Sequence, residues 1–333
     1  MPFIPNFTIT SDIVNQLTEI TENLDRIKYS RHNAITPHLR RINRLRSIHS
    51  SLAIEGNRLS IGDVTSIIEG KTVIGTEREI QEVKNANSAY KMMDSFDPFS
   101  KNDILEAHRI MMSGLVDKAG MFRTGDEAIT DSEGNIVHLA PHPGDIQGMM
   151  DDLIEWTASS DYPMMIKSSV FHYQFEYIHP FEDGNGRIGR LWQTVLLSKT
   201  NETFKWIPIE SLIRSYQKEY YDALEYSDST LDCTVFLEYM TRIVLKALIE
   251  LNESSARESI GVESRLTSNE LALYTMIRDG YFRDIGQSAD AMGVSRATLN
   301  RCLSSLKEKG IIRKEGNKKS GIWMVNEKSK KKG

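Results

Sequence analysis

The run HPFEDGNGRIGR, from His179 to Arg190, holds the side chains of this chain that are best suited to chemistry. Its histidine is a candidate base, Asp183 is an acid, a glycine-flanked turn follows, and two arginines complete the run. A site that transfers a phosphate-containing group needs a base, an acid and cationic groups close together. The run therefore predicts phosphate-transfer chemistry.

The second half of the run is suited to binding an anion. Gly184 and Gly186 allow backbone conformations that other residues avoid, and Asn185 between them offers a side-chain amide. The pattern from Arg187 onward predicts a helix, whose N-terminal amides and dipole would face bound phosphates. Arg187 and Arg190 lie three residues apart on one face of this helix, so both guanidinium groups can reach the same polyphosphate.

Helical periodicity before the run indicates how it is positioned. Apolar side chains recur there at helical spacing, at Val170, Phe171, Phe175 and Ile178. We therefore expect a mostly buried helix that delivers His179 at its C-terminal end. Pro180 then stops this helix.

At these residues the chain resembles the Fic (filamentation induced by cAMP) family, whose core motif is HPF-x-[DE]-GNGR-x-x-R. Every fixed position of the motif is present, namely His179, Pro180, Phe181, Asp183, Gly184, Asn185, Gly186, Arg187 and Arg190. A match of this length is far more specific than an isolated glycine-rich pattern. The resemblance implies a Fic-type helical core.

The resemblance also implies a reaction, the transfer of AMP from ATP to a Tyr, Thr or Ser hydroxyl of a target protein. His179 would be the general base and Asp183 would hold Mg²⁺. The other motif residues would bind ATP, with Gly184, Asn185 and Gly186 at the α-phosphate and Arg187 and Arg190 at the β- and γ-phosphates. Pyrophosphate would leave. Some members of the family transfer other phosphate-containing groups, and that alternative stays open.

Ser51 and Glu55 stand four residues apart on one face of a predicted helix, and Gly56 follows as a helix stop. Taken alone, this is a helix end with a solvated glutamate. Many Fic proteins carry an inhibitory helix with the pattern [ST]-x-x-x-E-[GN], which SLAIEG matches here. A carboxylate paired with Arg190 would occupy the guanidinium that holds the γ-phosphate, so the resemblance implies autoinhibition by Glu55. Alternatively, Glu55 could position a water that removes AMP.

Residues 120–146 break the helical pattern and predict a small β-hairpin. Turn-forming residues Asp131, Gly134 and Asn135 separate two β-prone pieces, 128–130 and 136–138. An ordinary surface hairpin is one interpretation. The resemblance implies a flap over the active site, which registers the target by strand-like pairing along Ile136, Val137 and His138. His138 and His142 lack a third ligand at a useful spacing, which argues against zinc.

Two further features lie on predicted helices. His108 falls among apolar residues, which is typical of a core or near-core histidine. Tyr220 and Tyr221 could both be core aromatics, but the resemblance places such a pair beside adenine, where a flat ring stacks. Some relatives have an asparagine shortly after this pair, and this chain has Asp228 at the corresponding place.

The C-terminal part resembles a winged helix-turn-helix. Residues 289–295 predict a helix, a tight glycine turn and a second helix capped by Ser295, and residues 311–325 predict a two-stranded wing. From Arg265 onward the charge is about +8, against about −13 before it. The DNA-binding candidates are Arg296, Thr298, Asn300 and Arg301 on the second helix and Lys318 and Lys319 at the wing tip. A dimerisation or protein-docking module is the alternative, so a homodimer stays open as well as DNA.

We therefore predict a mainly α-helical protein in three parts. They are an N-terminal helical region with the inhibitory motif (1–98), a Fic catalytic domain with a β-hairpin flap (99–252), and a winged helix-turn-helix domain (265–327). Charged residues at 26% and hydrophobic residues at 40% are ordinary for a globular protein. The sequence shows neither a membrane span nor a signal peptide, so we expect a cytoplasmic protein. A DNA-binding regulator whose Fic core senses nucleotide is the remaining alternative.

Overall fold

The computed structural model describes residues 4–29, 35, 37–130, 136–263, 266–278, 282, 284–315 and 322–326. Across these residues the chain is mainly α-helical, as predicted, with two small antiparallel sheets of two strands each. The chain divides into two compact units, Met1–Leu24 with Ile42–Ile249 and Asp25–Arg41 with Glu250–Gly333. None of the described helices combines the length and the hydrophobicity needed to cross a lipid bilayer.

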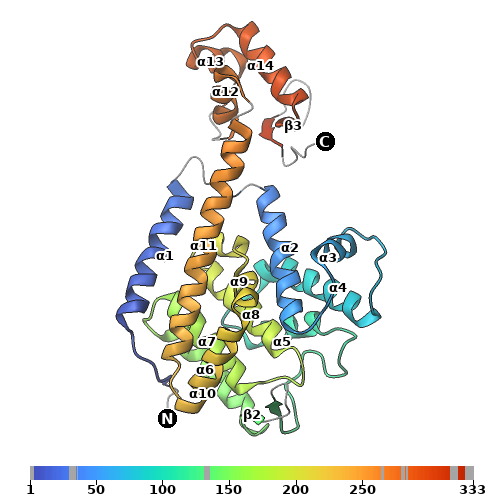
Figure 1. Ribbon diagram of the computed structural model, residues 1–333, viewed down its shortest axis with the longest axis vertical. Helices are drawn as coiled ribbons and strands as arrows, with labels where there is room; N and C mark the ends of the chain where they lie inside the picture. The colour runs from blue at the N-terminus through green and yellow to red at the C-terminus, as the bar shows by residue number, and fades with distance from the viewer. Residues whose placement is uncertain are drawn as a thin grey trace. The chain divides into compact units, whose positions relative to one another are not determined.

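The elements up to residue 263 are labelled in Figure 1 where there is room. The helices are α1 (Ser11–Tyr29), α2 (Pro37–Ile54), α3 (Ile61–Ile68), α4 (Glu77–Met92), η1 (Met93–Ser95), α5 (Lys101–Met111), α6 (Ile146–Ser159), α7 (Met164–Ile178), α8 (Asn185–Ser198), η2 (Glu202–Trp206), α9 (Ile209–Ser215), α10 (Gln217–Thr230) and α11 (Thr234–Glu263). Strands β1 (Ala128–Thr130) and β2 (Ile136–Leu139) form the first sheet.

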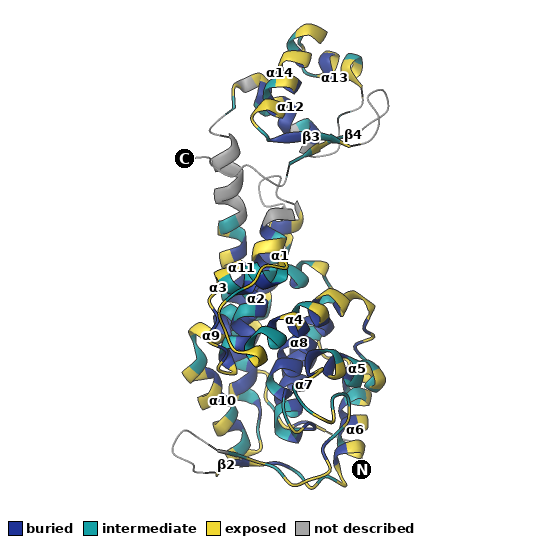
Figure 2. Ribbon diagram, turned by 90° about the vertical axis from the view of Figure 1, so that its right-hand side faces the viewer, coloured by how far each residue is buried: buried dark blue, intermediate teal, exposed yellow. Residues whose placement is uncertain are grey.

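Helices α7 and α8 pack against each other at the centre of the core, and Figure 2 shows both as largely buried. The aromatic residues Phe171, Phe175 and Trp192 on these helices are fully buried. Phe181, in the loop between them, is fully buried too. A loop that joins two buried helices and is itself packed into the core has little freedom to move, so its backbone is held in place for a ligand.

Local sequence explains where the helices around the site begin and end. Gly56, the second residue after the end of α2, adopts φ +88°, in the left-handed region that glycine tolerates best. Helix α4 begins with a capping box, in which Thr76 accepts a hydrogen bond from the backbone of Glu79 and the Glu79 side chain bonds back. Thr10 lies directly before α1, and its Oγ1 accepts from the backbone N–H of Ile13 at 3.3 Å, so Thr10 caps this helix.

The predicted hairpin is present. Strand β1 pairs antiparallel with β2, in a register that places Ala128 opposite Leu139 and Ile129 opposite His138, and it shifts between Ile129 and Thr130. The predicted turn residues 131–135 lie outside the described residues.

The C-terminal unit contains α12 (Ser268–Arg278), α13 (Ile285–Ala291), α14 (Arg296–Glu308), β3 (Ile312–Glu315) and β4 (Ile322–Val325). Its core includes Leu273, Leu299, Leu303 and Leu306. Ser295 caps α14 as predicted, because its hydroxyl accepts from the Thr298 N–H at 3.1 Å. Strands β3 and β4 pair antiparallel, and Lys318 and Lys319 lie outside the described residues.

Candidate active site

His179 sits where α7 ends, in a left-handed conformation with φ 49° and ψ 60°. Such a conformation is uncommon for a residue other than glycine, and here it turns the chain sharply out of the helix. The Nδ1 atom of its ring is buried and has no hydrogen-bond partner among the described residues. Burial lowers the pKa of His179, so the imidazole is neutral at pH 7 and a ring nitrogen can accept a proton.

The loop after His179 is closed by the side chain of Asn185. Its Oδ1 accepts from the Phe181 N–H at 2.9 Å, and its Nδ2 donates to the Phe181 carbonyl at 2.8 Å. Both polar atoms of the amide are therefore engaged within the loop. Asn185 Nδ2 carries a second N–H, so a donor to a phosphate remains on the side-chain amide as well as on the backbone.

Two glycines let other groups approach this loop closely. Gly184 has φ +93°, and a Cβ there would lie 2.8 Å from Met112 Sδ. At Gly186 a Cβ would lie 2.5 Å from Glu55 Oε1 and 2.9 Å from Arg190 Nη1. Because no side chain of the described part of the chain caps α8, the N–H groups of its first turn are available to an anion.

Arg190 meets Glu55, as the sequence pattern predicts. Nη2 of Arg190 donates to Glu55 Oε1 at 2.6 Å and to the Ser51 carbonyl at 3.1 Å, and Nε donates to Ser51 Oγ at 3.3 Å. The Arg190 side chain is 1% exposed and that of Glu55 is 31% exposed. Burial opposes the charge of Arg190, but the Glu55 carboxylate raises its pKa, so the guanidinium stays cationic.

Buried polar contacts hold α2, which carries Ser51, against its neighbours. Glu210 on α9 accepts from the Ser47 hydroxyl at 2.7 Å and from the Tyr90 hydroxyl at 2.6 Å. Asn43 Nδ2 also donates to the Trp206 carbonyl at 2.9 Å. These contacts fix the helix that presents Glu55 to Arg190, and the sequence alone does not indicate them.

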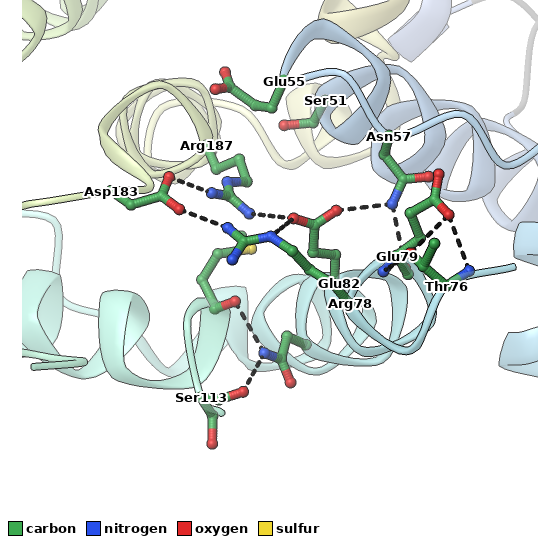
Figure 3. A network of polar contacts seen from close by, with 12 residues as sticks. Ser51, Glu55, Asn57, Thr76, Arg78, Glu79, Glu82, Ser113, Asp183 and Arg187 are labelled. Atoms are coloured by element: carbon green, nitrogen blue, oxygen red, sulfur yellow. Dashed lines mark hydrogen bonds and ion pairs between the residues drawn. The ribbon is translucent and has the colours of Figure 1, made fainter. Parts of the chain in front are cut away.

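Arg187 meets different carboxylates from Arg190. Its Nη2 donates to Asp183 Oδ1 at 2.6 Å, and its Nη1 lies 3.5 Å from Glu82 Oε1 on α4. The other oxygen of Asp183 accepts from Arg78 Nη2 at 2.8 Å (Figure 3). The two motif arginines, predicted to reach one polyphosphate, are thus each paired with an acidic side chain.

His108 supports the same loop through a defined tautomer. The Gly120 N–H donates to Nδ1 of His108 at 2.8 Å, so the ring proton lies on Nε2 and is donated to the Asp183 carbonyl at 2.9 Å. Burial lowers the pKa of His108 to about 4, and its ring stacks on Phe181 at 3.7 Å. Its predicted burial is confirmed at 1% exposed. The spacing of apolar residues predicts this burial, but it does not predict the hydrogen bond from His108 to the Asp183 carbonyl.

Arg123 is a second residue that the sequence analysis missed. Its buried guanidinium donates to the carbonyl groups of His179 at 2.8 Å, Gly125 at 2.7 Å and Pro141 at 2.6 Å. It therefore ties the chain on both sides of the flap to the backbone of His179. A charged residue in a polar stretch gives no signal that it will be buried.

The flap is fastened by His138. Its Nδ1 lies 2.9 Å from Asp228 Oδ2 and its Nε2 lies 2.8 Å from the Tyr177 carbonyl. Since both partners accept hydrogen bonds, both ring nitrogens must donate, which makes this side chain an imidazolium. Burial opposes that charge, but the bond to Asp228 raises the pKa of His138. Asp228, which stands where some relatives have an asparagine, thus holds the flap, and it also accepts from the Tyr173 hydroxyl at 3.0 Å.

The remaining predicted residues lie in different surroundings. Tyr220 is buried at 1% exposed and contacts His172 Nε2 at 3.1 Å, whereas Tyr221 is 47% exposed. On the flap, Ile136 is 64% exposed, and the side chain of Val137 is outside the described ones. An exposed ring such as Tyr221 can stack on a base, whereas Tyr220 belongs to the aromatic core.

Asp183 offers the kind of oxygen ligand that a divalent cation prefers. Its carboxylate is partly exposed, and each oxygen already accepts from a guanidinium, so the position favours positive charge. No three His, Cys, Asp or Glu side chains of the described chain gather around a common point suited to a metal. Mg²⁺ is commonly held by one or two carboxylates together with substrate phosphates, which is the arrangement this site offers.

Comparisons with known proteins show the family of this chain. A crystal structure of a Fic family protein from Desulfovibrio desulfuricans G20 is 36% identical in sequence, with a TM-score of 0.74. That match covers 99% of this chain and 100% of the other. The family model described as Fic/DOC family matches residues 98–197. The chain belongs to the Fic/DOC family.

Curated relatives of this Fic protein are more distant. The protein adenylyltransferase Fic of Aedes aegypti is 29% identical over 194 residues, which cover 54% of this chain and 36% of the relative. The protein adenylyltransferase fic-1 of Caenorhabditis elegans is 25% identical over 239 residues, which cover 68% and 44%. This chain therefore spans less than half the length of either relative.

Proposed function

We propose that this protein is an adenylyltransferase that transfers AMP from ATP to a hydroxyl side chain of a target protein. The observation that carries the proposal is the placement of His179, whose neutral ring has an unpartnered nitrogen. It lies beside a loop with free backbone amides and two motif arginines. The adenylyltransferase names of the curated relatives support the same activity.

The motif residues divide the reaction between them. His179 takes the proton from the target hydroxyl as its oxygen attacks the α-phosphorus, and the bond between the α-phosphorus and its bridging oxygen to the β-phosphate breaks. The amides of the first turn of α8 stabilise charge on the α-phosphate, and Arg187 and Arg190 hold the β- and γ-phosphates. Asp183 would hold Mg²⁺, which when bound neutralises charge on the phosphates. Pyrophosphate leaves.

Autoinhibition by Glu55 follows from the same assignments. Glu55 occupies the guanidinium of Arg190 that would otherwise hold the γ-phosphate. The carboxylate also places a negative charge where that phosphate must sit, so ATP is held in a pose unsuited to in-line attack. The buried polar contacts of α2 with α9 support this role, because they hold the inhibitory helix in place.

The flap offers a way to present the target. Among the described residues, β1 and β2 pair only with each other, so each strand keeps an open edge. An extended segment of a target could add to such an edge through main-chain hydrogen bonds, which place few demands on its sequence. The Ser, Thr or Tyr to be modified would then be registered against His179.

Labelled ATP tests the reaction. The Glu55→Gly protein, incubated with ATP labelled at the α- or the γ-phosphate, should retain the α-label on protein and release the γ-label. Retention of the γ-label instead would identify transfer of another phosphate-containing group. Loss of pre-attached AMP from a modified target, faster in the unmutated protein than in Glu55→Gly, would favour the alternative in which Glu55 positions water for AMP removal.

The C-terminal unit supports a second function, the binding of DNA. Arg296, Asn300 and Arg301 are exposed on α14, whereas Thr298 is half-buried and accepts from Arg301 Nη2 at 3.3 Å. We propose that this face contacts DNA phosphates. The full chain should then bind duplex DNA with an affinity that falls steeply with salt, and Arg296→Gln with Arg301→Gln should weaken it. Absence of binding at low salt would favour a docking or dimerisation module, and a homodimer would be seen by sedimentation.

A further inference from the structure

Arg78 lies outside the Fic motif, yet its side chain reaches the motif carboxylate. It is the second residue of α4, two positions after the Thr76 cap. Its Nη2 lies 2.8 Å from Asp183 Oδ2, and its Nε lies 3.4 Å from Glu82 Oε1 (Figure 3). The capping box fixes the start of the helix, so the position of Arg78 relative to the loop is set by the backbone.

The two guanidinium groups on Asp183 are held very differently. The Arg187 side chain is 3% exposed and also lies near Glu82. The Arg78 side chain is 55% exposed. A divalent cation at Asp183 would lie close to both guanidinium charges, and the repulsion between these charges favours the departure of one arginine. Arg78 is the group that can leave, since water can solvate it once the ion pair is broken.

We propose that Arg78 is a positioning residue that competes with the divalent cation for Asp183. It neutralises and orients the carboxylate in the protein without nucleotide, and it moves aside when the metal and the phosphates arrive. This inference rests on the proposed function only through the assignment of Asp183 as the metal ligand. It goes beyond that function because it adds a residue that sets how readily the metal enters.

Glu82 gives the displaced arginine a place to stay. Its Oε1 already lies 3.4 Å from Arg78 Nε, and its Oε2 accepts from Asn57 Nδ2 at 2.9 Å. Because Glu82 is held by Asn57 and lies near Arg187, its carboxylate is fixed in position. Arg78 can therefore release Asp183 by rotating about its side chain while it remains paired with Glu82. The exchange needs no movement of α4.

The test uses Mn²⁺, which gives a spectroscopic signal when it is free, in place of Mg²⁺. Mn²⁺ is titrated into the full chain, with and without ADP, and free Mn²⁺ is read by electron paramagnetic resonance. Arg78→Gln should bind Mn²⁺ about two- to fivefold more tightly, which is the range expected from removing a partly exposed ion pair. Arg78→Lys should lie nearer to the unmutated protein, because it keeps the charge.

A matched control and a ligand variant complete the experiment. Arg109 on α5 makes a comparable exposed ion pair with Glu106, at 2.6 Å, so Arg109→Gln should leave Mn²⁺ affinity unchanged. Unchanged or weaker Mn²⁺ binding by Arg78→Gln, while Asp183→Asn abolishes it, would overturn the role of Arg78 alone. If Asp183→Asn still binds Mn²⁺ normally, the metal assignment of the proposed function fails, and the inference fails with it.

Discussion

The two motif arginines of α8 lie one helical turn apart and meet opposing charges from different parts of the chain. Arg190 pairs with Glu55 at the end of α2, far away in sequence. Arg187 pairs with Asp183 in its own loop, and that carboxylate is shared with Arg78 of α4. In both places the protein supplies the charge that a nucleotide or a metal would otherwise bring.

The two places differ in how strongly that charge is held. Arg190 is 1% exposed and binds both Ser51 and Glu55. Arg78 is 55% exposed and pairs with acidic groups that are already neutralised by Arg187. A buried guanidinium loses most of its solvation and depends on its partner, whereas an exposed pair contributes little. We therefore infer that Glu55 inhibits strongly at the proposed γ-phosphate position, and that Arg78 is a weak, easily displaced barrier at the proposed metal position.

The largest expected effect comes from His179, which belongs to neither the Glu55–Arg190 pair nor the Arg78–Asp183 pair. His179→Ala should reduce AMP transfer about 10²-fold or more, because a neutral hydroxyl is a poor nucleophile without a positioned base. Nucleotide affinity should hardly change. Radiolabel transfer and a nucleotide titration on the same variant measure both quantities. Unaltered labelling would remove His179 from the role of base.

Breaking the ion pair between Glu55 and Arg190 should give the next largest effect. Glu55→Gly should raise labelling of the protein itself and of its target about 10- to 100-fold, because Arg190 becomes free for the γ-phosphate. Arg190→Ala should not do the same, since it removes the phosphate site together with the inhibitor site. The matched control is Glu69→Gly, since Glu69 also follows a helix and precedes a left-handed glycine. Equal labelling by the two glutamate variants would make the α2 end purely structural.

The ion pair between His138 and Asp228 serves as a reference for the other two pairs, because it holds the flap and has no proposed contact with a phosphate. The pKa of His138 is raised above its ordinary value of about 6.5, so its stabilisation is complete below that pH and is lost as pH rises through the raised value. Asp228→Asn should therefore lower stability by about 1–3 kcal/mol at pH 6 and by less at pH 9. Denaturant unfolding at both pH values measures this. An equal loss at both would show that His138 is not charged.

The smallest effect is expected from Arg78→Gln, and combining it with Glu55→Gly tests whether the two ion pairs act independently. Arg78→Gln should change Mn²⁺ affinity about two- to fivefold and leave the gain caused by Glu55→Gly intact. Glu55→Gly should leave the affinity for Mn²⁺ alone unchanged. The double variant should show both changes at full size, the first in the Mn²⁺ titration and the second in the labelling assay. If either change in the double variant differs markedly from its size in the single variant, the two ion pairs are coupled, with Asn57 and Glu82 as the connection.

The sequence predicted those parts of the site that lie within a short stretch or within a motif. Helical spacing located α7 and the position of His179 at its end, and glycine and turn chemistry located the loop and the hairpin. The contact of Glu55 with Arg190 was expected only because the six-residue pattern is associated with a partner arginine. Without that association, a single glutamate at a helix end carries no such information.

The parts that escaped prediction depend on tertiary packing. Arg78 is 105 residues from Asp183 in the chain, and its reach depends on how α4 lies against the loop. The hydrogen bonds of Arg123 within the described residues go to backbone carbonyl groups, which every residue has. The amide of Asn185 was expected at a phosphate, but whether it faces outward or closes its own loop is decided by the turn geometry and not by residue type.

The central claim, that Glu55 takes the place of the γ-phosphate on Arg190, is tested most directly by comparing the affinities for ATP and ADP. With Glu55 present, the γ-phosphate gains no arginine, so the unmutated protein should bind the two nucleotides about equally well. In Glu55→Gly, ATP should bind about tenfold more tightly than ADP, because Arg190 then contacts the third phosphate. Glu69→Gly should keep the unmutated ratio. If the ratio of the two dissociation constants is the same with and without Glu55, the account is contradicted.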